Sequence, residues 1–172
     1  HAYDDGKLNG GLHARYARAG ESLELLNGQM LALDADSLVI ADEARVLGLA
    51  GIMGGEGSGV QASTTDIFLE AAWFAPDAVA GKARSFGFSS DASHRFERGV
   101  DFGNTRNAMA RAAGLILSIC GGQPGPVVES LSADHLPKRA TVNLRTARAA
   151  RVLGIDIGAG RIEEAGQFAE QL

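Results

Sequence analysis

Short apolar runs separated by Gly, Asn or Asp fill the first part of the chain. They span residues 12–18, 23–26, 30–33, 37–40 and 46–50, and Asn27-Gly28 lies between the second and the third. Runs of this kind are typical of β-strands, and Asn-Gly is a strong hairpin signal. A sixth apolar run, at 66–74, carries Glu70 in its middle. The pattern predicts successive strands in antiparallel sheet.

The hydrophobic period changes to that of a helix after residue 75. Pro76 and Asp77 suit a helix start and Gly87 suits its end, which predicts a short helix between them. A longer helix is predicted over 104–120, before Gly121-Gly122. Its apolar positions share one face: Met109, Ala112, Ala113, Ile116 and Ile119. We expect this stripe to pack on the sheet.

The last part of the chain resembles the opening of another domain. Residues 122–126 and the stretch around Pro137 have linker composition, and 140–144 alternates as a strand does. Helices are predicted over 146–153 and 161–172. The predicted class is therefore α+β, with mainly antiparallel sheets packed with a few helices and a short partial helical domain after them.

The composition is that of a soluble globular protein. The chain has 172 residues, of which 45% are apolar and 22% charged, enough to bury a core. No apolar run approaches the roughly 20 residues of a membrane span, and residues 1–10 lack a signal segment, so we expect a cytoplasmic protein. A single cysteine, Cys120, excludes an internal disulfide framework, and no metal-ligand spacing is found, so no metal is expected.

Basic residues are concentrated in two segments. The formal net charge of −5 argues against a protein that coats nucleic acid with its whole surface. Residues 82–111, however, contain six bases and three acids, and residues 138–151 contain five bases and no acid. Such patches are suited to phosphate contacts, and the alternative is a basic helix face in solvent.

The densest glycine cluster, at residues 51–59, follows directly on a predicted strand. A phosphate loop would need a Gly-Lys-Ser/Thr ending, and a dinucleotide fingerprint would need a helix straight after, and residues 60–65 supply neither. Two interpretations remain open. Glycines let a ligand lie against the main chain and turn N–H groups towards an oxyanion, or they form a tight turn alone.

Two polar features also have alternative interpretations. Glu70 either alternates onto a solvated face, which alternation alone favours, or points into a pocket and accepts a hydrogen bond from a ligand. Residues 90–101 combine hydroxyls, a histidine and opposed charges, without the partner set of a catalytic triad. The structural interpretation of that stretch is a capped helix whose Arg95, Glu97 and Arg98 form ion pairs.

Four segments resemble, in the same order, blocks of the bacterial phenylalanyl-tRNA synthetase beta subunit. They are His1-Ala2-Tyr3-Asp4, Ile52-Met53-Gly54-Gly55-Glu56, Phe68-Leu69-Glu70-Ala71 and the stretch from Asp91-Ala92-Ser93-His94-Arg95 to Asp101. The resemblance implies an N-terminally truncated editing domain at 1–128. It implies a linker and the beginning of the next beta-subunit domain at 129–172.

In that family the editing site hydrolyses tyrosine wrongly esterified to the phenylalanine tRNA, in support of phenylalanine–tRNA ligation. The resemblance implies that Glu70 reads the para-hydroxyl of tyrosine and that His1 lies near the ester, as the catalytic residue that orients water. The other matched substrate-binding positions are Gly51, Gly54, Ser90 and Ala92. Ser90 stands where the family often has Thr, so the hydroxyl is kept and a methyl is lost.

The resemblance also implies partners. These are the 3′ end of tRNA and the synthetase alpha subunit in an alpha2-beta2 assembly, with no membrane and no DNA. No cofactor is implied for this chain, and ATP and magnesium are implied for the whole enzyme. Two alternatives differ in class: a non-catalytic tRNA-positioning or subunit-packing domain that uses Arg95, Arg98 and the patch at 138–151, and a nucleotide binder built on the glycine loop.

Overall fold

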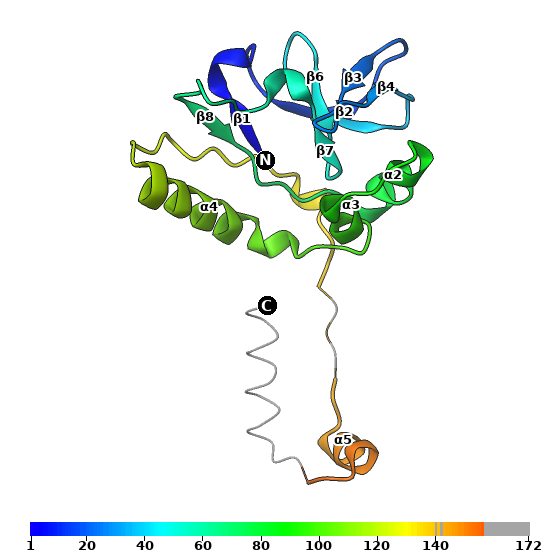
Figure 1. The fold of residues 1–172 in the computed structure, drawn as a ribbon. Coiled ribbons are helices and arrows are strands. Elements are labelled where there is room, and N and C mark those ends of the chain that lie inside the picture. Colours follow the sequence, from blue (N-terminus) through cyan, green and yellow to red (C-terminus); the bar gives the residue numbers. More distant parts are fainter. Residues whose placement is uncertain (140, 142, 157–172) are drawn as a thin grey trace. The chain divides into compact units, whose positions relative to one another are not determined.

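The computed structural model describes residues 1–139, 141 and 143–156 (Figure 1). The chain divides into two compact units, 1–129 and 130–172. In the described part of the second unit, a 3-10 helix spans Ala133–His135 and α5 spans Thr146–Leu153. Residues 141, 143 and 144 of the predicted strand at 140–144 have no strand structure. The predicted helix at 161–172 lies outside the described residues.

Short antiparallel strands build the first unit, as the apolar runs predict. The sheets contain β1 (Ala2–Asp4) with β8 (Ile67–Leu69), β3 (Ser22–Glu24) with β4 (Met30–Ala32), and β2 (His13–Tyr16), β5 (Leu38–Ala41), β6 (Val46–Leu49) and β7 (Met53–Gly54) in the order β2-β5-β6-β7. Figure 1 shows β1 beside β8, although most of the unit's sheet structure lies between them in sequence. The α+β class is confirmed.

The predicted hairpin at Asn27-Gly28 is confirmed. Leu23 pairs with Leu31 across β3 and β4, and the Leu25 N–H donates to the Gln29 carbonyl at 2.9 Å. Gly28 has a φ of 79°, a conformation that glycine adopts without a steric cost. The run at 66–74 forms a shorter strand than predicted, because β8 ends at Leu69 and Glu70 is the next residue.

The core is made of apolar side chains from all three sheets. Strand β6 lies between β5 and β7 in its sheet and is buried at all four positions. Leu25, Val39 and Leu47 have at most 1% of their surface exposed. Burial of each such side chain stabilises the fold by about 1.5–3 kcal/mol relative to exposure. This core fixes the turn between β6 and β7, which lies in the glycine cluster.

Two short helices replace the single helix predicted after Pro76. Helix α1 spans Pro76–Val79 and α2 spans Lys82–Ser85. Gly81, between them, has a φ of 76°, which a continuous right-handed helix does not allow. Val79 and Ala83 are both buried in the core. The break therefore lets each short helix contribute to the core separately.

The helix predicted at 104–120 forms as α4 (Thr105–Cys120), but most of its predicted apolar face is only half-buried. None of its residues is buried, and Ile119 is 78% exposed. Helical periodicity shows that one face is apolar but does not show what covers it. In this unit Phe74, Val79 and Ala83 already supply side chains to the core from the preceding segment.

Four further elements complete the first unit. Helix α3 spans Asp91–Phe96, and 3-10 helices span Asp5–Lys7, Glu56–Ser58 and Phe102–Asn104. Of the helices in the described residues, none combines the length and the apolar character of a membrane span.

An alanine at Gly51 is expected to destabilise the protein more than an alanine at Gly20. Both glycines have a positive φ, 68° and 83°, where another residue costs about 1–2 kcal/mol. A Cβ on Gly51 would also lie 3.1 Å from atoms of the Phe74 and Phe96 rings, whereas nothing lies within 4 Å at Gly20. Urea unfolding of the two variants measures the difference. Equal losses of stability would contradict close packing at Gly51.

Candidate functional site

Glu70 and His1 are opposite each other at the end of the β1–β8 pair. The register pairs Ala2 with Leu69. One position further along, two backbone hydrogen bonds join His1 and Glu70. The His1 amine donates to the Glu70 carbonyl at 2.7 Å, and the Glu70 N–H donates to the His1 carbonyl at 2.8 Å. Directly opposed residues of an antiparallel pair project from the same face. The predicted acid and the predicted catalytic histidine are therefore neighbours.

The carboxylate of Glu70 accepts a hydrogen bond from a tyrosine that is not among the predicted site residues. The Tyr3 hydroxyl donates to Glu70 Oε2 at 2.6 Å, and Tyr3 is only 1% exposed. Its ring contacts the His1 ring edge to face, with centroids 4.5 Å apart. Glu70 is half-buried and His1 is exposed. The three side chains form one cluster, which we call the Glu70 cluster, open on the His1 side.

The Tyr3 phenol has a perturbed acidity. Burial raises the pKa of Tyr3 well above its usual value, and the negative charge and the hydrogen bond of Glu70 raise this pKa further. Each cause disfavours the phenolate form of Tyr3, because its negative charge would be buried away from water and close to the negative charge of Glu70. Tyr3 therefore keeps its proton at neutral pH and remains a donor to Glu70.

Gly54 lies directly against the imidazole of His1. A Cβ built on Gly54 would clash with three atoms of the His1 ring, and Gly54 itself is buried. Its carbonyl accepts from the Leu26 N–H at 3.0 Å, which fixes this stretch of main chain. The structure thus brings together three of the predicted site residues, His1, Gly54 and Glu70.

Of the other predicted site residues, Ser90 bonds to Ile52 and Gly51 precedes Ile52 in the chain. Ser90 donates its hydroxyl to the Ile52 carbonyl at 2.6 Å and also caps helix α3. Gly51 packs against Phe74 and Phe96, and Ala92 is half-buried in the first turn of α3. Three residues of extended chain span at most about 11 Å, so Gly51 lies within that distance of Gly54.

Several N–H groups of the glycine cluster already have acceptors. The N–H groups of Ile52, Gly55 and Gly59 donate to the carbonyls of Leu49, Leu47 and Glu56 at 3.1, 2.7 and 3.0 Å. These three donors are part of the turn and strand structure. They are therefore not free to bond to a ligand, and the main chain at Gly54 is the part of the cluster that lies against His1.

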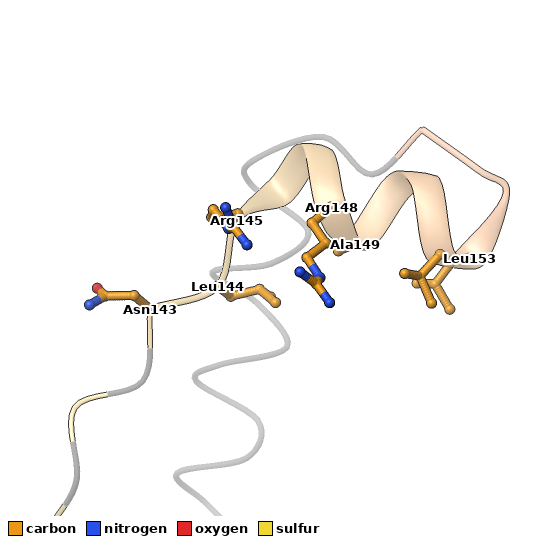
Figure 2. A pocket seen from close by; sticks show the side chains of 7 residues that line it. Asn143, Leu144, Arg145, Arg148, Ala149 and Leu153 are labelled. Carbon is orange, nitrogen blue, oxygen red and sulfur yellow. The ribbon is translucent and has the colours of Figure 1, made fainter.

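Two hollows lie away from the predicted site residues. One, of about 200 Å³, lies between β3, β6 and the 3-10 helix at Glu56–Ser58. The other, of about 500 Å³, lies in the second unit beside α5. Figure 2 shows that the residues before α5 and those of its exposed face line it, among them Leu144, Arg148 and Leu153. Neither hollow is lined by His1 or Glu70.

The charges of residues 90–101 form ion pairs, as their structural interpretation predicts. Arg95 contacts Asp91 at 3.1 Å and Arg98 contacts Glu97 at 2.8 Å, and all four lie on or just after α3. Ser90 and Ser93 form a reciprocal capping box at the start of this helix. Within the described residues, no group of three or more His, Cys, Asp or Glu side chains is arranged to hold a metal ion.

The raised pKa of Tyr3 predicts a loss of stability in alkali. The native state holds the phenol proton more tightly than the unfolded chain, whose tyrosines titrate near pH 10. This contribution is fully present below about pH 10 and decreases above it, by at most about 1.4 kcal/mol per pH unit. Urea unfolding between about pH 9 and pH 11 measures the slope. The Tyr3→Phe variant is the control and should lack this decrease of the unfolding free energy with pH. Equal slopes for the wild type and the variant would contradict the prediction.

Comparison with known proteins assigns the family. Residues 1–121 match the B3/4 domain model. The chain is 61% identical over 158 residues to the phenylalanine–tRNA ligase beta subunit of Aromatoleum aromaticum, covering 92% of this chain and 20% of that one. The corresponding protein of Dechloromonas aromatica is 60% identical, over 98% of this chain and 21% of the relative.

The chain thus spans about a fifth of the length of the curated relatives it matches. The resemblance to the phenylalanyl-tRNA synthetase beta subunit, which four sequence blocks indicate, is confirmed by these matches. Since the model match covers most of the chain, this chain belongs to the B3/4 domain family.

Proposed function

We propose that this chain is the editing region of a phenylalanine–tRNA ligase beta subunit, which hydrolyses tyrosine esterified to the 3′ end of the phenylalanine tRNA. The observation that carries the proposal is the Glu70 cluster, in which a half-buried carboxylate lies opposite an exposed imidazole on the same face of two paired strands. The names of the relatives supply the context of phenylalanine and tRNA.

Physical chemistry explains why such a site is needed. A synthetic pocket shaped for phenylalanine cannot strongly reject the same ring with one added hydroxyl, because discrimination of this kind reaches only about 10²-fold. A second site that accepts a hydrogen bond from the hydroxyl selects in the opposite direction. Phenylalanine would leave the second oxygen of Glu70, the one not bonded to Tyr3, without a hydrogen-bond donor, at a cost of roughly 1–3 kcal/mol or more.

The reaction at this site is hydrolysis of an aminoacyl ester. His1, exposed and with its ring against Gly54, orients a water molecule towards the ester carbonyl. The peptide backbone at Gly54 lies behind the imidazole, where the absence of a side chain leaves room for the ring. Gly51, Ser90 and Ala92 complete the wall near Ile52. No residue of the chain is assigned as a nucleophile.

The partners of the proposed function follow from the same assignment. The 3′ end of tRNA is the substrate, and the alpha subunit of the synthetase, in an alpha2-beta2 assembly in the cytoplasm, is the protein partner. ATP and magnesium serve the ligation reaction of the whole enzyme.

The alternative is a domain that positions tRNA without catalysis. Two of the arginines in that alternative, Arg95 and Arg98, form ion pairs with neighbouring acids on α3 and just after it. Such exposed pairs contribute little free energy and leave both residues accessible to phosphates. The positions of the basic residues therefore do not distinguish editing from tRNA positioning. The two functions differ in whether Glu70 is needed.

Glu70→Ala in the intact synthetase is expected to abolish deacylation of Tyr-tRNA, because the only acid of the Glu70 cluster is lost. Binding of the tRNA should change little. Glu56→Ala is a matched control, since Glu56 is an exposed acid of the glycine cluster outside the Glu70 cluster. Rates of release of labelled tyrosine from the tRNA measure both. Unchanged release by the Glu70 variant would reject the editing function and leave the positioning alternative.

Gly54→Ala tests the place of His1. The new methyl group would displace the His1 ring, which is an exposed side chain and is free to move away. We expect deacylation to fall by roughly 10- to 100-fold, as misplacement of a catalytic group does. The unfolding midpoint should change little because the main chain at Gly54 does not have a positive φ. Deacylation at the wild-type rate would remove His1 from the mechanism.

A further inference from the structure

The proposed function gives no role to Tyr3, although its hydroxyl is 2.6 Å from the Glu70 carboxylate. We infer that Tyr3 is a positioning residue that holds one oxygen of Glu70, so that the other oxygen is the one presented to the hydroxyl of a bound tyrosine. This inference rests on the proposed function and adds a specificity-determining residue to it.

The Tyr3 side chain is fixed and cannot be displaced by a ligand. The backbone of Tyr3 pairs with Phe68 of β8 and forms an isolated antiparallel β-bridge with Gly59. Only 1% of its surface is exposed, and it belongs to the hydrophobic core. A phenol held in this way acts as a rigid support. Glu70 is only half-buried, so its carboxylate is the accessible end of the pair.

The contact restricts the carboxylate in a way that the strand alone does not. The terminal torsion of a glutamate side chain has broad minima, so an unsupported carboxylate would rotate. The hydroxyl of Tyr3 has one hydrogen, and it donates that hydrogen in a hydrogen bond to Oε2 of Glu70. Oε1 has lone pairs available for a second donor. One carboxylate would then bridge two phenols, the buried one of Tyr3 and the one carried by the tRNA.

Such a bridge sharpens the discrimination against phenylalanine. A mobile carboxylate could turn to water when a phenyl group is bound and so avoid the loss of a hydrogen bond. A carboxylate held by Tyr3 stays directed at the ring. Tyr3 is protonated and a donor over the whole neutral range, and its raised pKa extends this range into alkali.

Tyr3→Phe tests the inference in the intact synthetase, since it removes only the hydroxyl and keeps the ring. We expect kcat/KM for deacylation of Tyr-tRNA to fall roughly 10- to 100-fold, through a higher KM as well as a lower kcat. The slow deacylation of Phe-tRNA should stay the same or increase. Tyr16→Phe is the control, because Tyr16 is 56% exposed on β2, away from the Glu70 cluster.

The ratio of the two rates separates positioning from simple structural support. A variant that merely loosens the fold would lose both activities together, and an unchanged Tyr/Phe ratio would overturn the inference. Site-specific 3-fluorotyrosine at position 3 keeps both ring and donor and should retain wild-type clearance. If the 3-fluorotyrosine protein lost as much Tyr-tRNA deacylation as the Tyr3→Phe variant, the inference would also be overturned.

The outcome for Glu70→Ala distinguishes this inference from the proposed function. If Glu70→Ala leaves deacylation of Tyr-tRNA intact, the editing function itself fails. If Glu70→Ala abolishes deacylation while Tyr3→Phe has the rate and the Tyr/Phe ratio of the wild type, the editing function stands and only the role of Tyr3 fails.

Discussion

The pairing of β1 with β8 is the constraint on which the candidate site depends. It joins residues 69 positions apart in sequence and sets His1 opposite Glu70 by two backbone hydrogen bonds. Because side chains alternate between the two faces of a strand, a shift of one residue in this register would turn the carboxylate away from the imidazole. Tyr3, buried in the core two residues after His1, ties the pair to the rest of the sheet structure.

Core and site are therefore continuous in this domain. The side chain that binds Glu70 belongs to the same buried cluster as Leu47 and Val39. Folding of the core thus also orders the carboxylate of Glu70. Little of the binding free energy of a ligand is then needed to fix the position of this carboxylate. The exposed His1 and the half-buried Glu70 are the parts of the arrangement that remain open to solvent.

Local sequence patterns predicted much of the fold. The apolar runs identified β2 to β6, and Asn27-Gly28 identified a hairpin. The pattern missed β1, whose sequence Ala2-Tyr3-Asp4 is not an apolar run, and β7, which has only two residues. It also missed the break at Gly81, because a helical period continues across a single glycine. The exposed face of α4 could not be predicted, since periodicity does not identify the surface that covers a helix.

The candidate site was less accessible to sequence reasoning. Alternation alone favoured a solvated Glu70, and only the resemblance to a family directed attention to it. Tyr3 carried one usable signal, its position two residues after His1 on one side of a strand, but the pairing with β8 is a tertiary contact that no local pattern encodes. The close approach of Gly54 to His1 has a further meaning for sequence variation. A side chain at position 54 would push the imidazole of His1 out of its present place, so the residue at position 54 decides where the side chain of position 1 lies, although the two positions are far apart in sequence.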